Sequence, residues 1–139
     1  MAIRKQEFYE GAALYQLART GRLRSVRYEP PIFTFNDTIT VLLKYSTKPR
    51  SPWPFTFSTE ERRLLVAHAE SGRCVVGLVC ASDGVVALDY AEFDFMVGSN
   101  SGAVHISCRR SHGSHYAVRG PEAELEHRVP QLSWPRILD

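Results

Sequence analysis

Lys44 lies near the end of a β-rich run at residues 38–46. A lysine in such a position could take part in phosphodiester cleavage. Such cleavage requires oxygen ligands that hold Mg²⁺ beside the scissile phosphate, while the lysine stabilises charge or orients water. Alternate residues of a strand point to the same face, so an acid at position 42 would meet Lys44 over one metal ion. Residue 42 is a leucine, which cannot bind a cation. The lysine is therefore present without the carboxylate that this chemistry would place beside it.

Three acidic residues elsewhere are candidates for the missing oxygen ligand. Glu7 and Glu10 lie in a helix-like segment near the N-terminus, and Asp37 follows Asn36 between two strand-like runs. Asn-Asp is also a good turn pair, because both residues tolerate the backbone dihedral angles that turns need. The simpler interpretation of Asp37 is therefore a turn residue, and a relocated Mg²⁺ site remains the alternative.

A second group of candidate residues follows Lys44 directly. The segment 44–53 combines cations, hydroxyl groups and two aromatic side chains, and it includes Lys48, Arg50 and Trp53. Cations and hydroxyls contact phosphates and an aromatic ring stacks on a base, so this mixture is typical of a nucleic-acid surface. Trp, Tyr and Arg also dominate protein interfaces, and a lysine at a strand end often only covers apolar surface with its stem. The segment predicts a surface that binds nucleic acid or a protein partner.

Histidines and cysteines are weaker candidates for chemistry. Three histidines lie across one expected hairpin, but no Cys or carboxylate completes a tetrahedral metal set at a recognisable spacing. We interpret them as turn and surface residues: His105, His112 and His115. The three cysteines lie in apolar strand-like runs without a CxxC pair, which predicts buried free thiols: Cys74, Cys80 and Cys108. No metal site is expected from either group.

Charge and hydropathy narrow the class of protein. The net charge is +2, but six Lys and Arg residues crowd the first 27 positions, whereas acidic residues collect between 89 and 126. A basic front suits docking on a phosphate backbone or on an acidic protein surface. No stretch approaches the length of a membrane span, and the N-terminus lacks the apolar middle of a signal peptide. We expect one soluble domain, residues 1–139, with a cytoplasmic location and no membrane contact.

The elements that position these residues begin with a helix at 5–19. Its apolar residues Phe8, Ala12 and Tyr15 recur at helical spacing, and Leu14 and Leu17 widen this apolar stripe. A weak strand at 23–28 comes next. The runs 32–35 and 39–46 then form a hairpin, because turn residues separate two β-branched and aromatic segments.

The second half of the chain begins with a helix and a buried strand. Ser58 and Glu61 form a capping box, which predicts a helix at 59–70. The run 74–80 is apolar throughout, as expected for a central strand covered on both faces. Further elements follow: a hairpin at 82–88, a helix at 90–97, strands at 104–108 and 116–118, and a tail at 129–139 that packs over a sheet edge around Trp134.

The order α-β-β-β-α-β over residues 5–80 resembles the core of the PD-(D/E)xK, or restriction-endonuclease-like, nuclease superfamily. In that family one strand carries an Asp and the next carries Asp/Glu-x-Lys, whereas here the matching positions read Ile32 or Phe33 and Leu42-Leu43-Lys44. The resemblance implies an α+β fold, in which a mixed sheet forms the αβββαβ core and residues 82–139 add a β-rich extension. A different mixed sheet with the same number of elements is the competing fold.

The function implied is that of a degenerate nuclease fold without catalytic acids. We expect a non-catalytic module that binds nucleic acid, or assembles with a protein of a nucleic-acid-handling complex, through Lys44, Lys48, Arg50 and Trp53. No cofactor is expected for such a module. The alternative is an active Mg²⁺-dependent nuclease in which Lys44 acts with a relocated carboxylate from Glu7, Glu10 or Asp37. Some members of the family use a carboxylate of the first helix, which here carries Glu7 and Glu10.

Overall fold

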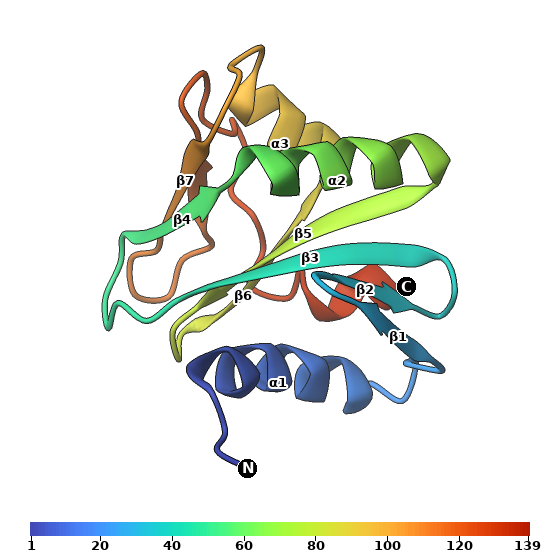
Figure 1. The fold of residues 1–139 in the computed structure, drawn as a ribbon. Coiled ribbons are helices and arrows are strands. Elements are labelled where there is room, and N and C mark those ends of the chain that lie inside the picture. Colours follow the sequence, from blue (N-terminus) through green and yellow to red (C-terminus); the bar gives the residue numbers. More distant parts are fainter.

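Two sheets and three α-helices make up the structure, a computed structural model that describes all 139 residues (Figure 1). The elements in chain order are α1 (Lys5–Ala18), β1 (Val26–Glu29), β2 (Ile32–Phe35), β3 (Ile39–Ser46), β4 (Trp53–Phe57), α2 (Thr59–Ser71), β5 (Arg73–Cys80), β6 (Gly84–Asp89), α3 (Tyr90–Val97), β7 (Val104–Arg109), β8 (Ala117–Arg119) and the 3₁₀ turn η1 (Pro135–Leu138). The protein is an α+β protein with a mixed main sheet. No helix has both the length and the apolar character needed to cross a bilayer.

The main sheet has the order β1-β2-β3-β5-β6, in which only β3 and β5 run parallel. β2 and β3 form the predicted hairpin, with Ile32 opposite Leu42 and Phe35 opposite Ile39. β5 lies between β3 and β6, and from Cys74 to Cys80 every residue is buried. The expected sheet of 32–36, 39–46 and 74–80 is confirmed, with β2 ending at Phe35, because the uninterrupted apolar run forms an interior strand between β3 and β6.

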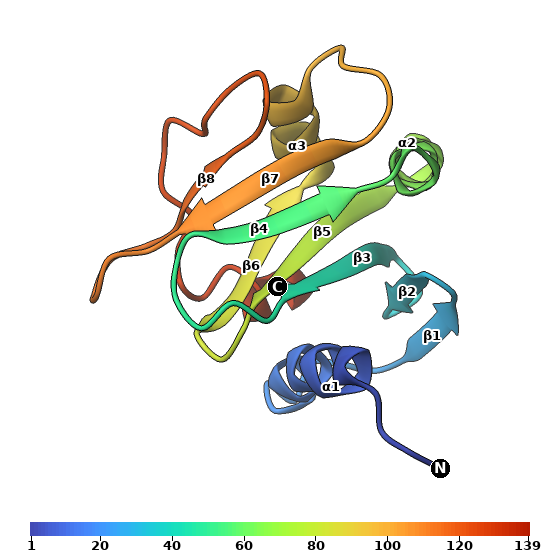
Figure 2. The same cartoon turned by 60° about the vertical axis from the view of Figure 1, so that its left-hand side comes forward.

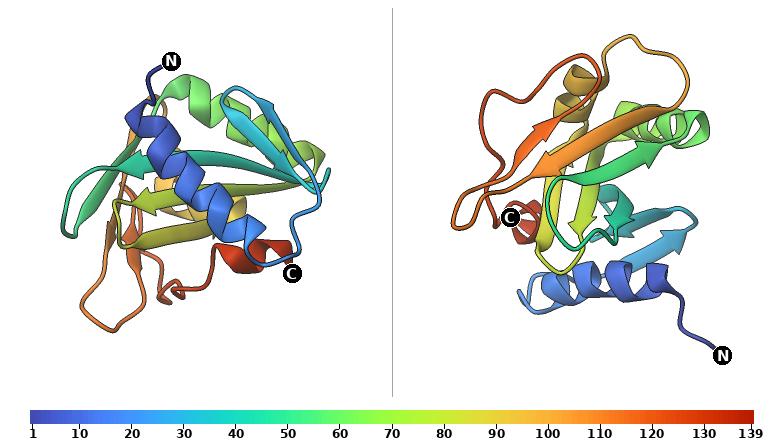
Figure 3. Two further views of the ribbon diagram at one scale, coloured as in Figure 1. Left: turned by 90° about the horizontal axis from the view of Figure 1, so that it is seen from below. Right: turned by 90° about the vertical axis from the view of Figure 1, so that its left-hand side faces the viewer.

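One face of the main sheet is covered by α1 and by the C-terminal tail (Figure 3). α1 buries Ala13 and Leu17, whereas Phe8 and Tyr15 are 63% and 66% exposed. The predicted helix is thus confirmed, but only part of its apolar stripe faces the core: Leu17 is buried, whereas Phe8 and Tyr15 face outward. The buried face is set by Trp134, which is fully buried and donates from Nε1 to the carbonyl of Ala13 at 2.9 Å. The tail therefore packs beneath the sheet rather than over its edge.

The opposite face of the main sheet is covered by α2, α3 and the second sheet, whose order is β4-β7-β8 (Figure 2). β4 alternates buried and exposed residues, and Phe55 and Phe57 pack with Val76 and Leu78 of β5 in the larger core. Pro54 fits in this strand because β4 is an edge. The extension predicted for 82–139 is shared between the two sheets, since β6 joins the main sheet while β7 and β8 join β4.

Candidate functional site

Lys44 forms an ion pair with Glu61 of α2. Lys44 Nζ donates to both Glu61 carboxylate oxygens, at 3.0 and 2.8 Å, and their side chains are only 23% and 21% exposed. The ammonium also lies 5.5 Å from the centre of the Phe57 ring, a cation–π distance. The cation predicted for catalysis or phosphate binding is therefore already neutralised.

Glu61 also caps α2, as its position three residues after Ser58 predicted. The Ser58 N–H donates to Glu61 Oε1 at 2.9 Å, and the Glu61 N–H donates to Ser58 Oγ at 3.1 Å. Burial alone would raise the pKa of Glu61, but the hydrogen bonds from Lys44 and Ser58 outweigh it and lower that pKa below its usual value. Glu61 is thus an ionised carboxylate with its acceptor positions largely used.

The two strand positions that hold acids in PD-(D/E)xK nucleases are part of the core here. Ile32 and Leu42 face each other across β2 and β3, 4% and 1% exposed, and both belong to the larger apolar cluster. Phe33 points to the opposite face, where it stacks on Tyr28 with ring centres 4.4 Å apart. Neither face of the β2–β3 hairpin therefore offers an oxygen ligand next to Lys44.

The acidic residues that were candidates for a relocated metal ligand lie in separate parts of the structure. Asp37 lies in the β2–β3 turn with φ of 60° and a side chain 76% exposed. The first residue of β3 is already about 16 Å from Lys44, at about 3.3 Å per strand residue, so Asp37 cannot reach it. Its turn role is confirmed, and its role as a ligand beside Lys44 is wrong.

Glu7 and Glu10 of α1 line a groove with Tyr28 and Phe33, on the α1 face of the sheet. Burial raises the pKa of Glu10, while the hydrogen bond from Gln6 Nε2, 2.8 Å long, and the charge of Lys44 oppose that rise. Nowhere in the protein do three or more His, Cys, Asp or Glu side chains cluster as metal ligands would. The acid in contact with Lys44 is Glu61, whose local sequence pattern predicts only a helix cap.

Only some of the predicted binding residues in segment 44–53 are exposed. Trp53 is 3% exposed, donates from Nε1 to the Lys48 carbonyl at 2.9 Å and packs against Tyr116. The role of Trp53 as a platform for a base is therefore wrong, because its ring is inside the protein. Lys48 and Arg50 are exposed in the connection between β3 and β4, without a carboxylate partner.

The three histidines of the β7–β8 region do not form a site. His105 is bonded to Thr56 Oγ1 at 3.0 Å, and His115 Nδ1 accepts from the backbone N–H of Gln131 at 3.2 Å. His112 lies exposed in the loop between the two strands. Their interpretation as turn and surface residues is confirmed.

Sequence reasoning missed a polar network beside the buried thiols. Arg110 donates to both oxygens of Asp83, each at 2.8 Å, and the Tyr116 hydroxyl donates to Asp83 at 2.6 Å. These contacts tie the β5–β6 turn to the second sheet and lower the pKa of Asp83, with Arg110 as the main cause. Cys80 and Cys108 are fully buried free thiols, as predicted, and the pKa of Cys80 is raised by its contact with Cys108 and by burial. A high thiol pKa makes Cys80 a poor nucleophile.

The outer face of α1 exposes aromatic side chains next to cations. We use this name for Phe8, Ala12, Tyr15 and Arg19, which recur along one side of the helix and are all exposed. The Arg19 guanidinium lies 5.7 Å from the centre of the Tyr15 ring. Large exposed aromatic groups on one helix face indicate an interaction surface more strongly than scattered apolar residues do.

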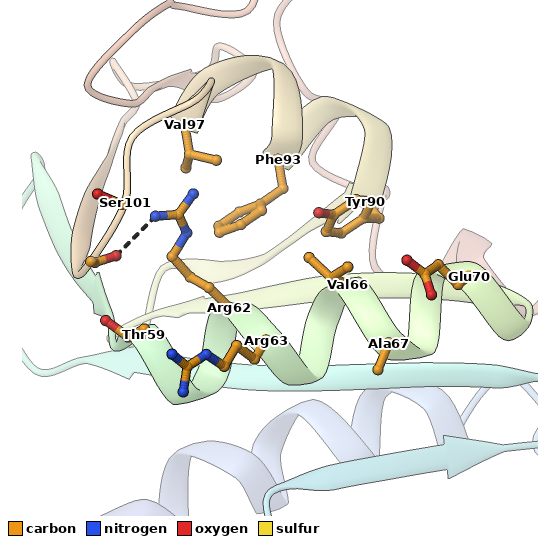
Figure 4. Close-up of a pocket in the computed structure, with 11 residues that line it drawn as sticks. Thr59, Arg62, Arg63, Val66, Ala67, Glu70, Tyr90, Phe93, Val97 and Ser101 are labelled. Atoms are coloured by element: carbon orange, nitrogen blue, oxygen red, sulfur yellow. Dashed lines mark hydrogen bonds between the residues drawn. The ribbon is translucent and has the colours of Figure 1, made fainter.

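A groove of about 460 Å³ lies between α2 and α3, and we call it the α2–α3 groove (Figure 4). Its apolar lining is made by Val66, Ala67, Tyr90, Phe93 and Val97. Its polar lining is made by Thr59, Arg62, Arg63, Glu70 and Ser101, together with Gly102. No local sequence pattern indicates these residues, because the groove exists only when two helices distant in sequence pack side by side.

Comparison with protein-family models, with curated proteins and with solved structures found no significant match.

Proposed function

We propose that the protein is a non-catalytic module that binds single-stranded nucleic acid through the outer face of α1. The observation that carries the proposal is the exposure of Phe8 and Tyr15, 63% and 66%, on one helix face among unpaired cations. Seven residues separate the two rings, which is about two helical turns or 10 Å along the axis. Aromatic platforms combined with positive charge are the usual means of binding single strands without sequence preference.

The charge around this face favours a polyanion. The first 27 residues contain six Lys or Arg and only Glu7 and Glu10 as acids, so this part of the chain is far more basic than the rest. Four of these cations have no carboxylate within salt-bridge distance: Arg4, Lys5, Arg19 and Arg24. Cations left unpaired beside exposed rings are available to phosphates, which contribute most of non-specific affinity.

Lys48 and Arg50 extend this surface. Tyr45, near the end of β3, stacks on Tyr9 of α1 with ring centres 5.1 Å apart. The connection that carries Lys48 and Arg50 therefore leaves the sheet beside the N-terminal half of α1. This arrangement keeps two of the residues expected to bind and replaces Trp53 with Phe8 and Tyr15 as the stacking groups.

The surroundings of Lys44 support the non-catalytic part of the proposal. Ile32 and Leu42 fill the positions where metal-binding acids would stand, and Glu61 holds the lysine. β4 lies between β3 and α2 in the chain but joins the second sheet. Apart from β4, the order of α1, β1, β2, β3, α2 and β5, with β3 and β5 parallel, resembles a PD-(D/E)xK core. This likeness supports an association with nucleic acid by fold analogy alone.

Fluorescence anisotropy with a labelled single strand of about 16 nucleotides, and with a duplex of equal length, tests the proposal. We expect the single strand to bind more tightly, with Phe8→Ala or Tyr15→Ala each costing about 1–3 kcal/mol. Replacing Arg4 or Arg19 by Met should lower the salt slope by about 0.7 each. Phe95→Ala is the matched control, because Phe95 is an aromatic residue of α3, 54% exposed.

Two outcomes would overturn the proposal. No binding below about 100 μM at low salt removes nucleic acid as the ligand, since even non-specific affinities reach that range. Binding that Phe95→Ala weakens as much as Tyr15→Ala does removes the outer face of α1 as the site. In the first case, the exposed rings are left as the anchors of a protein interface, for which the same residue types are typical.

A further inference from the structure

The α2–α3 groove is lined by apolar side chains with a few polar and charged groups, which is typical of a small-molecule site. Its volume of about 460 Å³ lies within the range that ligand pockets occupy. Phe93 and Val97 are almost fully buried and form its floor, whereas Val66 on its wall is 42% exposed. An apolar ligand that covers the exposed part of Val66 removes apolar surface from water, which is favourable.

Arg62 is the most informative side chain of the groove. Its Nη1 donates to the Gly102 carbonyl at 2.9 Å, so the guanidinium is held in a fixed orientation over the groove (Figure 4). No carboxylate lies within salt-bridge distance of it, although seven such pairs occur elsewhere in the protein. An arginine presents five N–H groups, so most of its donors remain free for a planar anion.

The two ends of the groove differ in charge. Figure 4 shows Thr59, Arg62 and Ser101 at one end, Glu70 at the other, and the Phe93 ring between Arg62 and Tyr90. A carboxylate fits the first end, where a guanidinium and hydroxyl groups meet. A second negative charge at the far end would be repelled by Glu70.

We propose that the α2–α3 groove binds a small amphipathic monocarboxylate, with its carboxylate on Arg62 and its apolar body over Val66 and Phe93. The site is independent of the outer face of α1, because it lies on the opposite side of the main sheet. The charge at each end sets the specificity: one anionic group is accepted, and a dianion of the same length is disfavoured.

Octanoate is a suitable probe, and its selectivity is the first part of the test. Titration of isotope-labelled protein should shift the amide resonances of Ser101 and Gly102 saturably, with a Kd in the millimolar range or tighter. Octanol, which lacks the charge, should bind about tenfold more weakly, because a hydrogen-bonded charge contributes about one order of magnitude or more. Suberate, which adds a second carboxylate at the same chain length, should also bind more weakly.

Two variants locate the probe in the groove. Arg62→Met keeps an apolar stem and removes the guanidinium, so octanoate affinity should fall about tenfold. Val66→Asp introduces a negative charge at an exposed position four residues after Arg62 on α2, where it would compete with the carboxylate for the guanidinium, so it should also weaken binding. Arg128→Met is the control, because Arg128 is exposed, unpaired and outside the groove. The octanoate affinity of this variant should equal that of the unmodified protein.

The same measurements can overturn the proposal. Failure of octanoate to shift the Ser101 and Gly102 resonances saturably would remove the site. Octanoate affinity that is unchanged in both Arg62→Met and Val66→Asp would place the ligand elsewhere. Equal affinity for octanoate and suberate would show that Glu70 does not set the charge selectivity that the proposal requires.

Discussion

Lys44 Nζ of β3 donates to both carboxylate oxygens of Glu61 of α2, at 3.0 and 2.8 Å. The pair joins the end of a central strand to the first turn of the helix that crosses over to β5. Because both side chains are about four-fifths buried, removal of either one leaves an uncompensated charge in a poorly solvated place. The lysine that resembles a nuclease residue thus has a structural partner, and its loss should be measurable as stability.

A double-mutant cycle on this pair gives the first prediction. Lys44→Met and Glu61→Gln should each lower the free energy of unfolding, and the double variant should lose less than the two single losses combined. The expected coupling free energy is about 0.5–3 kcal/mol, as found for contacting charges. Urea unfolding at neutral pH measures it. Additive losses would mean that the ion pair contributes nothing beyond the separate roles of the two side chains.

Acid sensitivity gives the second prediction. Hydrogen bonds from Lys44 and Ser58 lower the pKa of Glu61 against the effect of burial, and Arg110 lowers the pKa of Asp83. A carboxyl group with a depressed pKa in the folded state contributes stability above its unfolded pKa, near 4, and loses it as pH falls through the folded value. The free energy of unfolding should therefore drop from about pH 5 downward.

Amide variants assign this acid sensitivity to individual residues. Glu61→Gln and Asp83→Asn should each be less stable at pH 7 and show a shallower loss between about pH 5 and pH 3. Urea unfolding at a series of pH values provides the slopes. Glu126→Gln serves as the control, because Glu126 is exposed and forms no ion pair. A slope unchanged in both test variants would contradict the assignment.

Gly77 in the centre of β5 gives the third prediction. A Cβ atom there would lie 2.6 Å from Leu43 Cδ2 and 2.9 Å from Trp134 Cζ3, closer than packed atoms approach. Gly77→Ala should therefore destabilise the protein by about 1–3 kcal/mol through overpacking. Gly72→Ala is the matched control, since no atom lies within 4 Å of its Cβ position and its φ of 167° is extended. Thermal unfolding compares the stability of both variants. A Gly77→Ala variant as stable as the unmodified protein would contradict the tight packing of Trp134.

The elements that could be predicted from the sequence have local causes. The capping box of Ser58 and Glu61 begins α2 at Thr59, as expected, because the hydrogen bonds join residues three apart. Asn36 and Asp37 both take positive φ in the β2–β3 turn, which their side chains tolerate. β5 could also be predicted, because a continuous apolar run is typical of a strand that is buried on both faces.

The features that could not be predicted depend on contacts between distant residues. α1 carries apolar residues on two faces, and the face that is buried is decided by Trp134, 121 positions after Ala13. Trp53 is removed from the surface by β7 and Tyr116. The capping box explains Glu61 by local contacts alone, and its contact with Lys44 joins residues 17 positions apart. In each case one residue had two compatible roles, and packing selected between them.

The orientation of α1 gives the fourth prediction, which uses stability rather than binding. Leu17→Ala should cost about 2–5 kcal/mol, because Leu17 is fully buried in the smaller apolar cluster. Tyr15→Ala and Phe8→Ala should change the free energy of unfolding by about 0.5 kcal/mol or less, as is usual for surface positions. Chemical denaturation compares the three variants. A large loss in Tyr15→Ala would mean that the ring is packed, and would remove it as an exposed stacking group.

Metal binding gives the last prediction. We expect no saturable Mn²⁺ binding at micromolar concentrations near Lys44, because Ile32 and Leu42 provide no oxygen atoms and Glu61 accepts bonds from Lys44 and Ser58. Displacing these donors would leave the lysine unpaired and uncap α2, two costs that a metal site would have to offset. Isothermal titration calorimetry with Mn²⁺ is the measurement.

The variants for this titration separate a relocated site from no site. Micromolar binding that disappears in Glu10→Ala or Glu61→Ala, but persists in Glu126→Ala, would show that carboxylates around Lys44 hold a metal ion after all. That result would favour the Mg²⁺-dependent nuclease over the non-catalytic module, because a bound divalent ion beside a lysine can stabilise the charge that develops on a phosphate. Heat signals that do not saturate, or that are equal in all three variants, support the non-catalytic module, since they locate no metal at Lys44.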